Sequence, residues 1–262
     1  MRVVLTAGHD RALHVVAVAE LLRRRGHAVA AVLVVSPFRV SRVKALVRQR
    51  GRGFLRQAAR KLAGRAAAPS GGRDALAELL AREGVAERSL RRWAGAHGVP
   101  YHVVPDLDAP AAVRAVSGAD GVIYGGGGIL RRPFLEAARG RVLNAHAGPL
   151  PRVRGMNACE WTLLLGLSPA VTIHVIDAGI DTGGVVETIP LPVCPGDGVE
   201  SLRSRAVALG VEGLVRAAPV LLGPLPPPCP VAAPERQCFV MAPVLRDLLE
   251  ARLRAGRGAG TP

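Results

Sequence analysis

The chain opens with two short apolar runs separated by an amphipathic stretch, and this pattern limits the folds available to it. RVVLTA at 2–7 and AVAAVLVVS at 28–36 are continuous apolar runs of strand length, as found in strands that are buried on both faces. Between them, residues 11–27 carry apolar side chains at helical spacing and end near Gly26, which is typical of a helix C-terminus. This β–α–β opening predicts a parallel, doubly wound sheet.

The same alternation resumes after residue 97. The apolar patterns predict strands at 101–105, 120–126, 141–146, 170–177 and 183–193, and helices at 109–118, 156–166 and 198–218. A proline-rich connector at 224–230 then leads to a short strand and a final helix within 237–255. We therefore expect an α/β fold class, with a Rossmann-like doubly wound, mostly parallel sheet and a short C-terminal α/β extension.

Residues 37–97 interrupt this alternation. No Asp or Glu occurs from Leu21 to Arg73, a stretch rich in Arg. Apolar stripes within 43–62, followed by helical patterns at 74–84 and 87–98, predict a basic helical insertion. The insertion has two readings that the sequence leaves open, namely solvated faces of amphipathic helices or a surface for an acidic substrate, carrier or RNA.

Composition restricts the class of protein. The net charge of +15 fits either an anionic partner or the Arg-rich, Ala-rich usage of a GC-rich genome. The four cysteines lie far apart without metal-ligand spacing, so we expect neither a metal site nor a disulfide framework. No apolar run has the length of a membrane span, and the N-terminus lacks the features of a signal peptide. A cytoplasmic protein is expected.

The segment NAHAGPLPRVRG at 144–155 contains the first candidate site. Asn144 and His146 stand at the end of a predicted parallel strand, where α/β proteins bind ligands. Side chains at i and i+2 of a strand share one side, so the two can converge on one small group. An amide donor beside an imidazole suits the polarisation of a carbonyl and the stabilisation of an oxyanion.

The segment TIHVIDAGIDTGG at 172–184 adds a candidate base. His174 lies in a predicted strand, and Asp177 and Asp181 lie in the glycine-rich loop after it. Asp181 can accept an amine proton directly or through water, whereas Asp177 is typical of a turn. His174 is equally compatible with a buried strand histidine and with a member of the site.

Together, these two segments resemble the folate-dependent formyltransferase family, which includes glycinamide ribonucleotide, methionyl-tRNA and sugar N-formyltransferases. The resemblance covers about residues 120–190. The family motif N-x-H-x-S-L-L-P, then R/K-G, then a D-x-G turn is matched at Asn144, His146, Leu150, Pro151, Arg154, Gly155 and Asp181. His174 matches a position that is His in some members.

The resemblance implies roles for these residues. Asn144 and His146 would hold and polarise the formyl group of 10-formyltetrahydrofolate, and Asp181 would organise a water and help to remove the amine proton. No metal is implied. The loops expected to contact the donor contain Gly125, Gly126, Gly127, Ile129, Leu130, Gly179 and Ile180. Weaker candidates for substrate contact are His174, Arg154, His9 and Asp10.

The sequence also departs from the family pattern. Gly148 and Pro149 replace the Ser and Leu of the motif, and 124–128 is richer in glycine than usual. The first turn at 7–13 is not of the type that holds the phosphate of glycinamide ribonucleotide, and the C-terminal pattern is not that of the methionyl-tRNA enzymes' β-barrel. We expect a formyltransferase-like catalytic domain at 1–193, with the insertion at about 37–97, and a C-terminal helix, connector, strand and helix at 194–262.

The predicted function is an N-formyltransferase that acts on the amine of a small molecule, such as an amino sugar or a biosynthetic intermediate. One alternative is a hydrolase that releases formate from formyltetrahydrofolate. Another is a non-catalytic basic member of the fold that binds RNA or a carrier. The expected partner is a small-molecule amine, with no membrane, and a homodimer and nucleic acid binding stay open.

Overall fold

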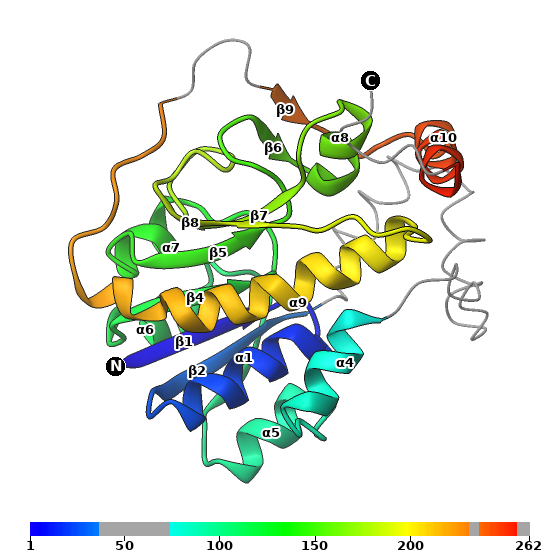
Figure 1. Cartoon of the computed structure of the whole chain (residues 1–262). Coiled ribbons are helices and arrows are strands. Elements are labelled where there is room, and N and C mark those ends of the chain that lie inside the picture. The colour runs from blue at the N-terminus through cyan, green and yellow to red at the C-terminus, as the bar shows by residue number, and fades with distance from the viewer. Residues whose placement is uncertain (37–73, 231–235, 256–262) are drawn as a thin grey trace, which may run out of the picture.

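The computed structural model describes residues 1–36, 74–230 and 236–255 and shows a layered α/β fold (Figure 1). A seven-stranded sheet has the order β3-β2-β1-β4-β5-β7-β8. Its strands are β1 Arg2–Ala7, β2 Ala28–Val35, β3 Tyr101–Val104, β4 Gly121–Gly125, β5 Val142–His146, β7 Ala170–Val175 and β8 Val185–Pro190. The strands β3, β2, β1, β4 and β5 run parallel to one another. Strand β7 runs antiparallel to β5, and β8 runs antiparallel to β7. This arrangement confirms the expected mostly parallel sheet.

Helices cover both faces of the sheet (Figure 1). The core on one face includes side chains of α1 Leu13–Arg24, α4 Ala75–Arg82, α5 Leu90–Ala96 and α9 Val199–Ala217. The core on the other face includes side chains of α6 Pro110–Ser117 and α7 Arg132–Ala137. Both cores consist mainly of Val, Leu and Ala, as expected for a chain with few aromatic residues.

A second, two-stranded sheet lies beside the large one. It pairs β6 Val153–Gly155 with β9 Arg236–Cys238 in parallel. Helices α8 Ala158–Leu164 and α10 Pro243–Arg254 contact each other next to it, and a 3₁₀ turn, η1 Ala218–Leu222, follows α9. Elements β6, α7 and η1 have no counterpart in the sequence prediction.

The helical insertion is described only in part. Helices α4 and α5 fall where helices were expected, and residues 37–73 lie outside the described residues. The domain boundary at residue 193 stays a prediction. Helix α9, which follows it, packs against β5, β7 and β8. Among the described residues, no helix is long and apolar enough to cross a membrane.

Glu20 joins two helices of the first core. It is buried on α1 and accepts hydrogen bonds from Arg23, from Arg24 and from Trp93 Nε1 on α5, the last at 3.0 Å. The hydrogen bond from Arg23 is the main cause that lowers the pKa of Glu20 to about 2. The ionised carboxylate is therefore the form that the folded protein stabilises.

We expect Glu20→Ala to lower the free energy of unfolding by about 2–4 kcal/mol, because Trp93 Nε1 and two guanidinium groups lose their shared acceptor. Urea denaturation measures this change. Glu212→Ala, which removes an exposed ion pair with Arg82, should cost less than about 1 kcal/mol. Since the folded pKa is depressed, the contribution of Glu20 is present above pH 4.5 and lost as the pH falls towards 2. Equal costs for both variants would contradict this account.

Candidate active site

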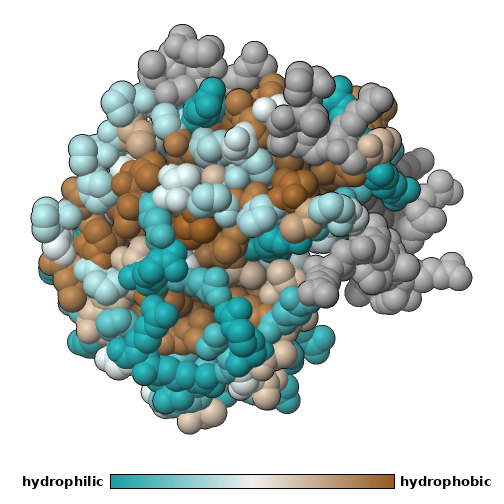
Figure 2. All heavy atoms as spheres, in the orientation of Figure 1, coloured by the Kyte–Doolittle hydropathy of each residue, from teal (hydrophilic) through white to brown (hydrophobic). Residues whose placement is uncertain are grey.

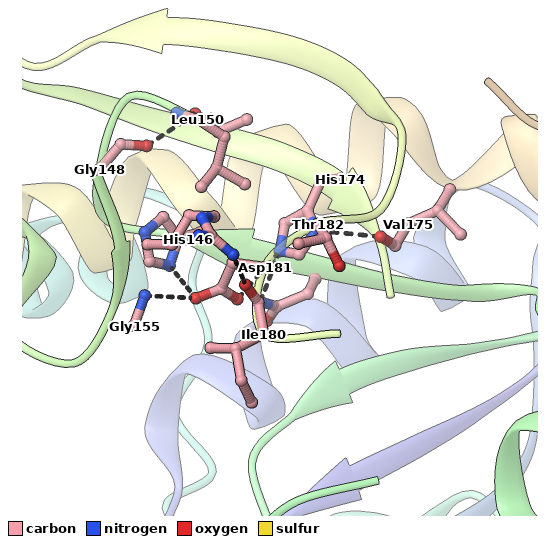
Figure 3. A network of polar contacts seen from close by, with 12 residues as sticks. His146, Gly148, Leu150, Gly155, His174, Val175, Ile180, Asp181 and Thr182 are labelled. Carbon is pink, nitrogen blue, oxygen red and sulfur yellow. Dashed lines mark hydrogen bonds and ion pairs between the residues drawn. The ribbon is translucent and has the colours of Figure 1, made fainter. Parts of the chain in front are cut away.

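Four polar side chains meet where β5 and β7 lie side by side, and Figure 3 shows the two histidine rings on either side of a carboxylate. Asp181 Oδ2 lies 3.5 Å from His146 Nδ1, and Asp181 Oδ1 lies 3.7 Å from His174 Nε2. Asn144 Nδ2 lies 3.0 Å from His174 Nε2. The structure therefore brings together the three residues expected to be catalytic, together with His174.

Strand register explains this convergence. In the antiparallel β5–β7 pair, Asn144 lies opposite His174 and His146 lies opposite Thr172. Side chains two residues apart share a face, and directly opposed side chains are near neighbours. The register thus brings Asn144, His146 and His174 together, and the loop after β7 adds Asp181.

The hydrogen bonds of His146 assign its ring protons. Its Nε2 lies 2.9 Å from the carbonyl oxygen of Val153, and a carbonyl can only accept, so Nε2 carries a proton. Nδ1 then faces the Asp181 carboxylate.

His174 holds the amide of Asn144. Its Nδ1 donates to the carbonyl oxygen of Val175 at 3.0 Å, so Nε2 is the acceptor for the Asn144 amide. Burial is the main cause that lowers the pKa of His174 to about 4, against the opposing effect of Asp181. A neutral His174 at pH 7 therefore fixes Asn144 with Nδ2 turned towards it, which leaves the second amide hydrogen for a ligand.

We expect His174 to stay neutral through the physiological range and to titrate near pH 4. Because the pKa in the folded protein lies below the ordinary histidine value of 6.5, the unfolded chain binds more protons between these values, and stability falls as the pH drops from about 6.5 to 4. NMR titration of the imidazole signals measures the midpoint. A His174 midpoint at or above 6.5 would contradict the neutral state assigned to it.

The Asp181 loop is held in one conformation by its contacts. Asp181 has a positive φ of 52°, a conformation that Asp and Asn tolerate better than most residues. Its Oδ2 accepts from the backbone nitrogen of Gly155 at 2.8 Å, and Arg154 donates to the carbonyl oxygen of Ile180 at 3.2 Å. Arg154 and Gly155 of β6 thus hold the loop and the carboxylate of Asp181 in place.

Gly155 itself leaves no room for a side chain. Its φ is +94°, and a Cβ there would overlap the carbonyl oxygen of Cys238 on β9. Gly148 is confined as well, because a Cβ would lie 2.8 Å from that of Ala158 and 3.0 Å from His146 Nε2. The Gly that replaces the family's Ser therefore follows from the close packing of α8 behind His146.

Asp177 is a turn residue, as the sequence favoured. Its carboxylate accepts from the nitrogen of Gly179 at 3.0 Å and from the Thr182 hydroxyl at 2.6 Å. It therefore shapes the loop that carries Asp181.

The glycines after β4 form a loop anchored from two sides. Thr6 Oγ1 donates to the carbonyl oxygen of Gly126 at 2.8 Å, and His14 Nε2 contacts that of Gly125 at 3.0 Å. Of the apolar residues expected at the donor loops, Leu130 is buried, whereas Ile129 and Ile180 are 72% and 38% exposed.

A cavity of about 630 Å³ lies between α7 and the two ends of the Asp181 loop. Its walls include Leu135, Ile176, Gly183 and Pro226, with Arg132 and Arg139 at the sides. The seven residues expected to contact the donor are not among its lining residues. The cavity instead involves their neighbours on the same two segments.

His9 and Asp10 lie in the turn after β1, apart from this cluster. His9 is exposed. The Asp10 carboxylate accepts from Ser89 Oγ at 2.7 Å, from the nitrogen of Arg91 at 2.8 Å and from Tyr101 Oη at 3.0 Å. These three donors occupy the carboxylate, so its contacts are with α5 and β3 rather than with the Asn144 cluster.

The sequence analysis missed Thr172, and it matched Gly155 to the motif without predicting that its backbone nitrogen donates to Asp181. Thr172 Oγ1 donates to the carbonyl oxygen of Gly148 at 2.7 Å and accepts from the nitrogen of Leu150 at 3.2 Å, which fixes the turn after His146. Thr172 and His174 lie two residues apart in a predicted strand, so their side chains share a face, and this spacing could have identified Thr172. The backbone nitrogen of Gly155 had no such signal. No group of three or more His, Cys, Asp or Glu among the described residues could hold a metal ion.

A family sequence model described as formyl transferase matches residues 111–218, a range that includes Asn144, His146 and Asp181. The matched part of this chain is therefore similar in sequence to formyltransferases. A methionyl-tRNA formyltransferase of Anaeromyxobacter dehalogenans is 37% identical over 135 residues, which cover 50% of this chain and 43% of that protein. The match thus spans less than half of the relative's length.

Solved structures of formyltransferases share the fold over more of the chain. Phosphoribosylglycinamide formyltransferase of Bacillus halodurans has a TM-score of 0.57 at 18% identity, over 85% of this chain and 95% of that one. A sugar N-formyltransferase of a Shewanella species has a TM-score of 0.56 at 11% identity, over 97% and 87% of the two chains. At these identities the likeness concerns the fold.

Proposed function

We propose that this chain transfers the formyl group of 10-formyltetrahydrofolate to the amine of a small molecule. The convergence of Asn144, His146 and Asp181 carries the proposal. These are an amide donor, an imidazole and a carboxylate at the carboxyl end of a sheet strand, where α/β proteins bind ligands. The family match over the same residues supports formyl transfer as the reaction.

The cavity beside the Asp181 loop fits a flat, partly apolar ring such as the pterin of the donor. Its glycines let a ring approach the backbone, and its volume lies in the range of small-molecule sites. Ile129 and Ile180 add exposed apolar surface on the two loops. The donor supplies a formyl carbon bound to nitrogen. Arg132 and Arg139, at the cavity wall, suit the carboxylates of its glutamate tail.

Each residue of the cluster would have its own role in the reaction. The amide of Asn144, held by His174, would donate a hydrogen bond to the carbonyl oxygen as negative charge develops there. His146 would turn its Nδ1 towards the same site, because its Nε2 proton is already donated to the carbonyl oxygen of Val153. The amine nitrogen would attack the formyl carbon, and Asp181 would take its proton directly or through a water. That proton would pass to N10 of the donor as the bond between N10 and the formyl carbon breaks and tetrahydrofolate leaves. The buried setting strengthens each of these contacts.

The test is turnover of 10-formyltetrahydrofolate with a pooled library of amines, followed optically for tetrahydrofolate and by mass for formylated products. The proposal expects a formylated amine with the native protein and none with Asp181→Asn. Formate release without an amine would assign a hydrolase instead. If tetrahydrofolate does not bind while RNA binds with a steep dependence on salt, the chain is a non-catalytic member of the fold.

A further inference from the structure

The proline-rich connector at 224–230 lies against the loop that carries Asp181. Its sequence is PLPPPCP, so five of its seven residues are prolines. Proline fixes φ and lacks an N–H, which makes such a run stiff and leaves it few backbone donors. Only Leu225 and Cys229 of the connector keep an N–H. In Figure 1 the connector lies in the orange segment that leaves the end of α9 and continues towards β9.

Two contacts join the connector to the Asp181 loop. The backbone nitrogen of Cys229 donates to the carbonyl oxygen of Thr182 at 3.0 Å. The carbonyl oxygen of Pro226 lies so close to Gly184 that a Cβ there would overlap it. The first contact fixes the chain directly after the carboxylate, and the second fixes the end of the loop, where β8 begins.

The connector is itself anchored where it begins. Leu221 of η1 is buried, and Leu225 packs against the first core. Arg141, directly before β5, donates from Nη1 to the carbonyl oxygen of Gly223 at 3.0 Å. Figure 2 shows hydrophobic side chains on this side of the molecule, whereas hydrophilic ones gather over α1, α4 and α5. A stiff segment that is anchored in this way offers the loop a fixed surface.

The position of the carboxylate depends on the conformation of this loop. Asp181 has a φ of 52°, which few residues adopt, and its Oδ2 accepts from the nitrogen of Gly155 at 2.8 Å. Gly179 and Gly183 on either side give the loop many alternative conformations. Asp177 joins parts of the loop to one another, whereas the connector and β6 join it to the rest of the molecule.

We propose that the connector is a positioning element of the reaction, which holds the Asp181 loop so that the carboxylate stays where the amine reacts. The connector acts through Asp181. It also lines the cavity proposed for the donor, so one segment would hold both the donor and the base. This inference rests on the proposed function and adds to it a positioning role for a segment far along the chain.

Two variants push the connector and the loop apart with different atoms. In Cys229→Pro, a ring carbon on the nitrogen replaces the hydrogen that Thr182 accepts, within a run that is already rich in proline. Gly184→Ala places a Cβ against the carbonyl oxygens of the connector. Two matched controls avoid these effects. Cys229→Ala keeps the N–H, and Gly118→Ala adds a Cβ where nothing lies within 4 Å.

We expect both variants to lower the single-turnover rate about three- to tenfold at saturating donor and amine, which is the net effect of about one hydrogen bond. Both controls should stay within about twofold of the native rate. In the Asp181→Asn background neither variant should slow the reaction further, because the base through which the connector acts is already lost. A loss of the same size in that background would show a purely structural effect and overturn the inference.

Hydrogen exchange at Gly155 gives a second measurement that does not depend on activity. Because the Gly155 N–H donates to Asp181, its exchange rate reports whether the carboxylate is in place. NMR should show exchange about threefold or more faster in Cys229→Pro and Gly184→Ala than in the two controls. The N–H of Leu5 in buried β1 should exchange at the native rate in all four, which shows that the fold is intact.

The two measurements separate this inference from the proposed function. Equal exchange at Gly155 in the variants and the controls overturns the positioning role, whatever the activity. A native protein that forms no N-formyl product contradicts the proposed function. The exchange comparison then still decides whether the connector holds Asp181 in place.

Discussion

Asp181→Asn is expected to lower kcat by about 10²–10⁴-fold, the usual contribution of a positioned general base. The amide of Asn has nearly the same shape, tolerates the positive φ of this position and can still accept from Gly155. The loop should therefore keep its conformation while the base is lost. Steady-state kinetics with the identified amine give kcat, and tetrahydrofolate calorimetry checks that the site is intact.

Asp120→Asn is the matched control for this variant. It makes the same change at the opposite end of the sheet, where Asp120 accepts from the backbone nitrogen of Arg2. It should leave kcat within about twofold of the native value, because surface changes away from a site have small effects. An Asp181→Asn variant that retains native kcat would remove Asp181 from the reaction.

Asn144→Ala is expected to lower kcat by about 10²–10³-fold, the effect of removing one donor to a developing oxyanion. Tetrahydrofolate affinity should change little, because the contact strengthens only as negative charge develops. Asn144→Asp keeps the size but lacks both amide hydrogens, and it should be at least as slow. These rates are measured by single-turnover kinetics at saturating donor and amine.

Asn157 provides the comparison, since it is the only other Asn in the chain. Its amide donates to Glu160 at 2.9 Å and accepts from the nitrogen of Met241. Asn157→Ala should therefore lower stability without a comparable loss of kcat. If both Asn variants slow the reaction equally, Asn144 acts through structure and not through the carbonyl oxygen.

The sequence was enough to predict the sheet because its strands are continuous apolar runs. RVVLTA and AVAAVLVVS became β1 and β2 with bounds that differ by at most one residue. β6 could not be predicted, since it has three residues and its partner β9 begins at Arg236, far along the chain. Helix α7 was missed because its six residues are too few to show a helical repeat of apolar side chains.

The candidate site was partly accessible from sequence. Spacing alone placed Asn144 with His146, and Asp181 followed from the paired motif. The tautomers of His146 and His174 could not be predicted from sequence, because they depend on hydrogen bonds to the carbonyl oxygens of Val153 and Val175. Asp10 shows the reverse case. It stands in a loop typical of substrate contact, yet three protein donors occupy its carboxylate.

The most direct test of the proposed reaction follows the formyl carbon itself. The native protein and Asp181→Asn are incubated with 10-formyltetrahydrofolate labelled with ¹³C in the formyl group and with the amine pool, and the label is traced by NMR. The account predicts label in an N-formyl amine, formed in equal amount to tetrahydrofolate, with the native protein alone. Label that stays in the donor, or appears only in formate, would contradict the transfer of a formyl group to an amine.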